Sequence, residues 1–99
     1  MQYEHKVVQW ANDRGIIENS TPIAQLAKTQ EELDELVAAV KANDFPEIVD
    51  GIGDVMVTLI IVAAMKGLTI ESCLGEAYDV IKHRTGRLNK EGVFVKDSP

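Results

Sequence analysis

The sequence predicts an all-α fold, a four-helix bundle-like arrangement with a short extended C-terminal tail. Three observations predict this class. Residues 23–43 contain neither glycine nor proline and are rich in strong helix formers. Apolar residues recur at helical spacing in the first, second and fourth segments between the turn signals. The connections are short, which favours packed helices in a single domain spanning residues 1–99.

The first two helices are expected over residues of about 2–18 and 22–42. In the first, Tyr3, Val7 and Trp10 follow a helical spacing, and Gly15 weakens the end. Trp10 suits a core position better than a platform on which a base stacks. The second helix has a clear start, because Thr21 is able to cap the first free amide groups and a proline follows it.

The third and fourth helices are expected over residues of about 47–66 and 70–83, with the tail covering residues 84–99. Pro46 lies at the start of the third helix, and Gly67 is a natural residue for its end. Thr69 is placed to cap the fourth helix. Two glycines break helical continuity in the tail, where residues 93–95 fit a short strand or an arm on a neighbouring subunit.

The second helix carries a cluster of carboxylates. Glu32 and Glu35 share one stripe with Lys28, and Glu31 lies at its edge. The apolar residues of this helix form a separate stripe, so the acids avoid the main core face. This is the first half of a candidate metal site.

The third helix supplies the second half of that site. Glu47, Asp50 and Asp54 share one face, and an apolar run over residues 55–64 follows them. A helix with almost no polar side is surrounded by protein, and a carboxylate there is costly unless it is paired or binds a metal. Gly51 and Gly53 indicate close approach of a ligand or another backbone. The alternative is an ordinary solvated acidic face, but two acidic helices across one turn favour the metal site.

Charge limits the partners. The net charge of −6 is a poor footprint for duplex DNA, so we expect no nucleic-acid partner. Residues 1–81 hold 5 basic and 14 acidic residues, whereas residues 82–99 hold 5 basic and 2 acidic ones. This division suits an anionic ligand that arrives with divalent cations. Lys82, Arg84 and Arg87 are placed to hold phosphates, and the alternative is a solubilising C-terminus.

The single cysteine, Cys73, excludes an intrachain disulfide and a zinc cluster of the usual kind. We therefore expect a reducing, cytoplasmic setting. The N-terminus lacks the apolar core of a signal peptide. The run over residues 55–65 is shorter than the roughly 20 apolar residues that span a bilayer, so we expect no membrane partner.

The paired acidic motifs resemble those of the MazG-like, all-α nucleoside triphosphate pyrophosphohydrolases. Glu31, Glu32 and Glu35 match the first motif of that family, and Asp50 to Asp54 resembles the second. One position departs from the pattern, because Gly51 stands where the family usually has a glutamate. Asp50 or Glu47 is expected to supply the missing oxygen. The resemblance extends to the first helix and to the basic tail.

The resemblance implies hydrolysis of a nucleoside triphosphate to a monophosphate and pyrophosphate, as nucleotide-pool house-cleaning. It implies Mg²⁺, with Mn²⁺ as a substitute, and attack of an activated water at the α-phosphorus. Glu31 or Glu47 is then the general base. The implied metal ligands are Glu32, Glu35, Asp50 and Asp54. The implied substrate-binding residues are Trp10, Gln25, Lys28, Lys82, Arg84 and Arg87.

Other readings stay open. A narrower relative would hydrolyse dUTP, dCTP or phosphoribosyl-ATP. A non-catalytic helical module would bind a regulatory cation or a basic partner, and Gly51 would then record lost activity. No phosphate-binding loop of the GxxxxGK[ST] type occurs. We also expect a homodimer or homotetramer, because the apolar surface of residues 55–64 exceeds what three short helices cover.

Overall fold

The computed structural model describes residues 1–97. In this part of the chain the fold is built of helices and one small sheet, and the predicted all-α class is confirmed. The end of the predicted tail, residues 98–99, lies outside the described residues. The elements, in chain order, are α1 (Gln2–Asp13), α2 (Ile16–Asn19), α3 (Pro22–Lys41), α4 (Phe45–Met65), α5 (Ile70–Ile81), β1 (Gly86–Leu88) and β2 (Phe94–Lys96).

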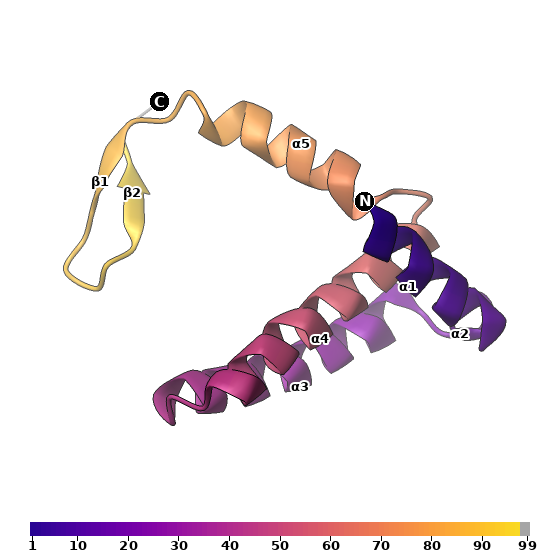
Figure 1. Ribbon diagram of the computed structural model, residues 1–99. Coiled ribbons are helices and arrows are strands. Elements are labelled where there is room, and N and C mark those ends of the chain that lie inside the picture. The colour runs from indigo at the N-terminus through magenta and orange to yellow at the C-terminus, as the bar shows by residue number, and fades with distance from the viewer. Residues whose placement is uncertain (98–99) are drawn as a thin grey trace.

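The predicted first helix is two helices in the structure. Gly15 has a φ of 72°, in the left-handed region that favours glycine, and it separates α1 from α2. The chain turns at this point, as Figure 1 shows. The residue expected to weaken the helix end therefore breaks the helix, and α2 packs against α1 and α4.

Side-chain caps fix the starts of the longer helices. The Thr21 hydroxyl accepts a hydrogen bond from the Ala24 N–H at 3.1 Å, and the Thr69 hydroxyl accepts one from the Ser72 N–H at 3.0 Å. Both predicted caps are thus confirmed. Helix α4 begins at Phe45, two residues earlier than expected, because the Asp44 carboxylate accepts from the Glu47 N–H at 3.4 Å.

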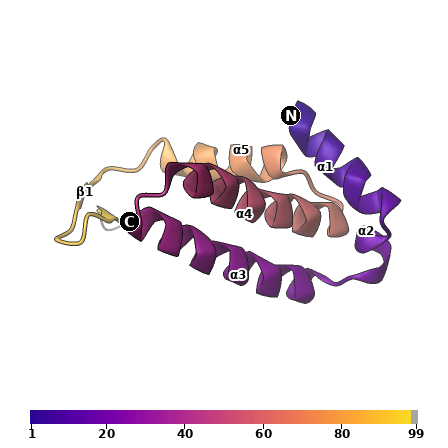
Figure 2. The same ribbon diagram turned by 60° about the horizontal axis from the view of Figure 1, so that its bottom comes forward.

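The centre of the molecule is the antiparallel pair of α3 and α4 (Figures 1 and 2). Two contacts hold these helices close together. Gly51 is buried against Leu36, and the hydroxyl oxygens of Thr29 and Thr58 lie 2.7 Å apart. Helix α1 crosses α4 near the C-terminal end of α4 (Figure 1). The buried apolar residues are few and mostly small: Ala11, Ala39, Ile60, Ile61 and Ala63.

Helix α5 and the hairpin that follows it form an arm, residues 70–97, that diverges from α4 (Figure 1). Strands β1 and β2 pair antiparallel, with Arg87 opposite Val95, so the predicted extended tail is a β-hairpin. At the base of the arm, the buried Glu4 carboxylate of α1 accepts hydrogen bonds from the N–H groups of Ile70 and Glu71. The radius of gyration is 16.0 Å, against about 13 Å for a compact chain of this length.

Helix α4 is long and apolar enough to cross a membrane by length and composition alone, with a mean hydropathy of 2.1 over its most apolar window. Residues 55–65 were expected to be too short to span a bilayer. That expectation is wrong as a statement of length, because the apolar helix continues back to Phe45. The absence of a membrane partner stays a prediction.

Candidate metal and nucleotide site

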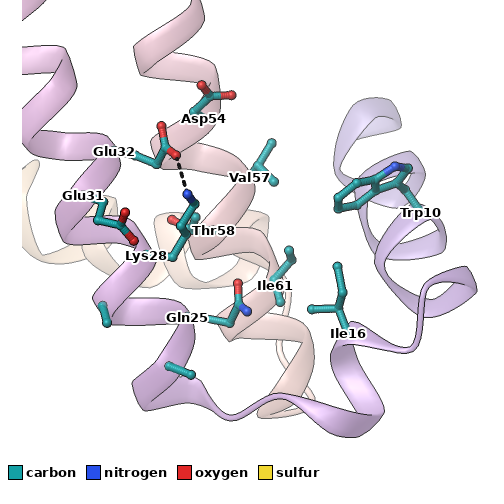
Figure 3. Close-up of a pocket in the computed structure, with 12 residues that line it drawn as sticks. Trp10, Ile16, Gln25, Lys28, Glu31, Glu32, Asp54, Val57, Thr58 and Ile61 are labelled. Carbon is teal, nitrogen blue, oxygen red and sulfur yellow. Dashed lines mark ion pairs between the residues drawn. The ribbon is translucent and has the colours of Figure 1, made fainter.

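A cavity of about 540 Å³ lies between the pair α3 and α4 on one side and α1 and α2 on the other. Its size is in the range of small-molecule sites. One end is polar and carries carboxylates, and the other end is apolar, as Figure 3 shows. The lining residues are Trp10, Ile16, Ala24, Gln25, Ala27, Lys28, Glu31, Glu32, Asp54, Val57, Thr58 and Ile61.

Glu32 is the central carboxylate of the polar end. It projects from α3 toward α4 and is 9% exposed. The negative charge of Glu32, followed by a hydrogen bond between the two carboxyl groups, raises the pKa of Glu35 above its ordinary value. Glu32 and Glu35 therefore face the same space, as their shared stripe predicts.

Asp54, on α4, lies at the same polar end of the cavity as Glu32. Loss of solvent raises the pKa of Asp54, and the charges of Asp50 and Glu32 raise it further. Asp54 thus lies within electrostatic reach of Asp50 and Glu32, and Glu35 within reach of Glu32. Carboxylate oxygens are the donors that Mg²⁺ and Mn²⁺ prefer, so the donor set fits such an ion.

The four carboxylates are not yet arranged as a finished coordination shell. Within residues 1–97 no three acidic, imidazole or thiol groups already surround one point at ligand distance. Glu35 and Asp50 are exposed. A bound cation therefore requires these side chains to rotate toward Glu32 and Asp54.

Lys28 provides positive charge beside the carboxylates. Its ammonium lies 3.3 Å from Glu32 Oε1, one turn away on α3 (Figure 3). The hydrogen bond to Glu32, with the charge of Glu31 next, raises the pKa of Lys28. The side chain stays 53% exposed, so it is accessible to an anionic ligand in the cavity.

The structure explains the departure at Gly51. A Cβ atom at this position would lie 3.2 Å from Leu36 Cδ1 and 3.3 Å from Leu36 Cβ, so a glutamate there meets the body of α3. The charge of Asp50, one residue earlier on α4, acts on Asp54. The close approach expected at Gly51 is confirmed, but Gly53 faces open space.

The apolar end brings Trp10 to the cavity, where it faces Val57 and Ile61 across the open space (Figure 3). Trp10 is 44% exposed and carries the Arg14 guanidinium 4.7 Å from its ring centre. Trp10 is therefore a wall of the cavity rather than a core residue. Gln25 also lines the cavity, and its amide donates to the Ser20 hydroxyl at 3.1 Å.

Three residues near the cavity were missed by the sequence reasoning. Thr58 is 5% exposed, lines the cavity and donates to the Val55 carbonyl at 2.7 Å. Its signal was a single hydroxyl inside an apolar run. Tyr3 and Lys6 line a second cavity of about 340 Å³, which shares Trp10 and Asp54 with the first.

Six predicted site residues do not line the cavity in the described chain. Two of them, Glu35 and Asp50, lie within electrostatic reach of lining carboxylates. Glu47 lies in the first turn of α4, two turns before Asp54. Lys82 pairs with Asp79 at 3.0 Å, and Arg84 and Arg87 lie further along the arm. The functional roles of all twelve predicted site residues stay predictions.

Paired acidic helices beside an apolar-walled cavity, in an all-α fold, form an arrangement able to hold a divalent cation and an anionic ligand. The family model of the MazG nucleotide pyrophosphohydrolase domain matches residues 20–88. The chain belongs to this family.

Two individual proteins show the relationship. The chain is 44% identical over 57 residues to an uncharacterized 18.2 kDa protein of Haemophilus phage HP1, in the rep-hol intergenic region. That match covers 58% of the chain and 35% of the phage protein, so the chain spans about a third of its relative. The fold is similar to that of a cyanophage S-2L MazG-like pyrophosphohydrolase, whose solved structure holds dGDP and three catalytic Mn²⁺ ions per active site. The TM-score is 0.75 at 16% identity, covering 98% of this chain and 95% of the other.

Proposed function

We propose that the protein hydrolyses a nucleoside or deoxynucleoside triphosphate to the monophosphate and pyrophosphate, with Mg²⁺ or, in its place, Mn²⁺. One observation carries this proposal. A single cavity is lined by Glu31, Glu32 and Asp54, by Lys28 and by the ring of Trp10. The carboxylates suit the metal ion that accompanies a nucleotide, Lys28 suits its phosphates, and the Trp10 ring suits its base. The metal and dGDP in the cyanophage relative support the same chemistry.

The carboxylates Glu32, Glu35, Asp50 and Asp54 are proposed to hold the cation. When bound, the cation would offset phosphate charge and make a water more acidic. The charge of Glu32 raises the pKa of Glu35, and loss of solvent, followed by the charges of Asp50 and Glu32, raises the pKa of Asp54. The concentration of negative charge that these shifts reflect favours uptake of a cation in this position.

Glu31 is proposed as the general base. It lines the cavity beside Lys28 and is exposed, so its carboxylate is able to accept a proton from a water near the phosphates. Glu47 is the second candidate, at the outer end of the acidic face of α4. Replacing each of them by glutamine in turn separates the two candidates, since loss of the general base lowers kcat while metal affinity is retained.

Lys28 is proposed to bind phosphate, and Trp10 and Gln25 to contact the base. Lys28 lies at the carboxylate end of the cavity, and Trp10 stands at the apolar end (Figure 3). A nucleotide that spans the cavity would therefore place its phosphates near the acids and its base near the tryptophan. Lys82, Arg84 and Arg87 are proposed to neutralise the outer phosphates and the leaving pyrophosphate.

The test is release of pyrophosphate from canonical and modified nucleoside and deoxynucleoside triphosphates, with and without Mg²⁺. The panel includes dGTP, dUTP, dCTP and phosphoribosyl-ATP, so that it also separates the broad activity from the narrower alternatives. Glu35→Gln is expected to abolish turnover while the fold stays intact. Asp34→Asn is the matched control, because Asp34 is exposed on the same helix and pairs with Gln30.

Metal-dependent release of pyrophosphate with the matching monophosphate, lost in Glu35→Gln and kept in Asp34→Asn, supports the proposal. No turnover on any substrate by the folded protein would overturn it. That result would favour a non-catalytic module, for which Gly51 in place of the usual glutamate is the structural indication.

A further inference from the structure

A second cavity, of about 340 Å³, adjoins the first on the side of α1. Three residues line both cavities: Trp10, Asp54 and Val57. The remaining lining residues are Tyr3, Lys6 and Val7 of α1, none of which has a role in the hydrolysis proposed above. A ligand held at Asp54 and against the Trp10 ring therefore lies at the boundary of the two cavities.

One face of α1 supplies four of these lining residues. Tyr3, Lys6, Val7 and Trp10 stand at positions i, i+3, i+4 and i+7, which lie on the same side of a helix. This face therefore presents two aromatic rings, one valine and one ammonium group to the second cavity.

The walls of the second cavity suit a flat ring. Apart from Lys6 and Asp54, its lining is aromatic or aliphatic. The proposed function already places the nucleobase beside Trp10, whose ring faces Val57 across the open space (Figure 3). Planar bases stack on aromatic rings and pack against aliphatic side chains. The base of a nucleotide whose phosphates lie near Asp54 therefore comes within reach of Lys6, one turn from Trp10 on the same face of α1.

The Lys6 ammonium is available for a ligand. It lies 5.0 Å from the centre of the Tyr3 ring, an attraction that holds it on the face of α1 that borders the cavity. Within residues 1–97 it forms no ion pair, whereas Lys28 is paired with Glu32. The Lys6 side chain is exposed. Its three N–H donors are thus not taken up by a carboxylate.

Arg14, the other cation close to Trp10, is placed differently. Its guanidinium lies over the Trp10 ring and donates to the Trp10 carbonyl at 3.2 Å. Arg14 lines neither of the two cavities. Among the described residues, Lys6 is therefore the cation that borders the second cavity.

An ammonium group discriminates among nucleobases because it donates hydrogen bonds and accepts none. The 6-oxo group of guanine or hypoxanthine and the 4-oxo group of uracil or thymine accept such bonds. Adenine and cytosine carry an amino group at the same position, and this group donates. A donor that faces another donor leaves both without a partner, which costs binding free energy.

We propose that Lys6 is a specificity-determining residue and that the substrate is a nucleotide with a keto base, which carries an oxo group at C6 of a purine or C4 of a pyrimidine. Lys6 would donate to this oxygen while the ring lies against Trp10 and Val57. The inference rests on the proposed function, because it assumes that the phosphates lie at the carboxylates. It assigns part of the base selection to α1, in addition to Gln25 of α3.

Binding of matched nucleotides tests this preference without turnover. Trp10 is the single tryptophan of the chain, so its fluorescence reports a ligand in either cavity. The probes are the α,β-imido analogues of dITP, dATP, dUTP and dCTP with Mg²⁺, because they resist cleavage between the α- and β-phosphates. We expect the Kd to be about tenfold lower for the dITP analogue than for the dATP analogue, and for the dUTP analogue than for the dCTP analogue.

Variants of Lys6 test whether this residue causes the preference. Lys6→Met is expected to bring both Kd ratios close to one by weakening the binding of the keto analogues. Lys6→Arg keeps the donors and the preference, and Lys6→Glu, which accepts from an amino group, is expected to reverse it. Because Lys6 is exposed, these variants are expected to fold. Lys41→Met, at the exposed end of α3 and outside both cavities, is the control and should leave the ratios unchanged.

Equal Kd values for keto and amino analogues in wild type would overturn the inference. So would an equal loss of affinity for all four analogues in Lys6→Met, which would place Lys6 against the phosphates. Pyrophosphate release from the natural triphosphates separates this inference from the proposed function. Turnover by wild type without a keto preference overturns the base assignment alone. A keto preference in binding without any turnover supports the base assignment and overturns the hydrolysis.

Discussion

The Lys28 ammonium lies 3.3 Å from the Glu32 carboxylate, so the lysine proposed to bind phosphate is paired with a proposed metal ligand. A metal ion bound to Glu32 would compete with Lys28 for that carboxylate and release the ammonium toward the substrate. The pair therefore keeps Lys28 at the site before substrate arrives.

Lys28→Met is expected to raise KM for the triphosphate by about tenfold or more, because a hydrogen bond to a charged group is worth about 1.5–3 kcal/mol. Steady-state kinetics at saturating Mg²⁺ measure this change. Lys41→Met, at the exposed end of the same helix, is the control. An unchanged KM in Lys28→Met would remove Lys28 from the phosphate site.

The raised pKa of Asp54 predicts a pH dependence of stability in metal-free buffer. The native state holds this proton more tightly than the unfolded chain, so ionisation above the raised pKa destabilises the fold. Asp54→Asn removes that charge and is expected to raise Tm at pH 7, with the gain disappearing near pH 4, roughly the ordinary aspartate pKa.

In Mg²⁺ we expect the wild type to have the higher Tm, because wild type binds the ion and Asp54→Asn does not. Thermal unfolding in EDTA and in Mg²⁺ gives both results from one series. A variant that melts below wild type at pH 7 in EDTA would show that Asp54 carries no repulsion in the native state.

The two glycines of the second acidic motif are expected to respond differently to alanine. Gly53 is exposed with open space around its Cβ position, so Gly53→Ala should raise the free energy of unfolding by about 1 kcal/mol through helix propensity. Gly51→Ala should gain less, since the new methyl group meets Leu36 at 3.2 Å. Urea unfolding of both variants measures the difference. Equal gains would mean that α3 and α4 separate freely.

The buried Glu4 carboxylate is expected to stabilise the base of the arm. Glu4→Ala leaves the Ile70 and Glu71 N–H groups without this acceptor and should cost about 1–3 kcal/mol. Hydrogen exchange should accelerate in the first turn of α5 and not in α3. Glu18→Ala, at an exposed position of α2, is the control. Unchanged protection of α5 would show that the turn at Thr69 is sufficient to hold it.

Sequence periodicity predicts the parts of the site that lie on single helices. Glu32, Glu35 and Lys28 share a stripe in any straight helix, and the structure brings Glu32 and Asp54 together because the turn at residues 42–44 reverses the chain. The caps at Thr21 and Thr69 are likewise local, so their residue types are sufficient to predict them.

Relationships between distant elements were not predictable in this way. The place of Trp10 in the cavity depends on the crossing of α1 over α4, and the capping of α5 by Glu4 joins residues 66 positions apart. The coverage of an apolar helix face also depends on its neighbours. The apolar surface of residues 55–64 was expected to exceed what the neighbouring helices cover, whereas α5 and the start of α4 are the more exposed elements.

The Glu4 contact also connects the helix that lines the cavity with the arm. Glu4 and Trp10 lie on the same rigid helix, α1, with about 9 Å between them along its axis. Trp10 forms a wall of the cavity, and Glu4 holds the first turn of α5. A rigid-body rotation of α1 would therefore displace the cavity wall and the base of the arm together.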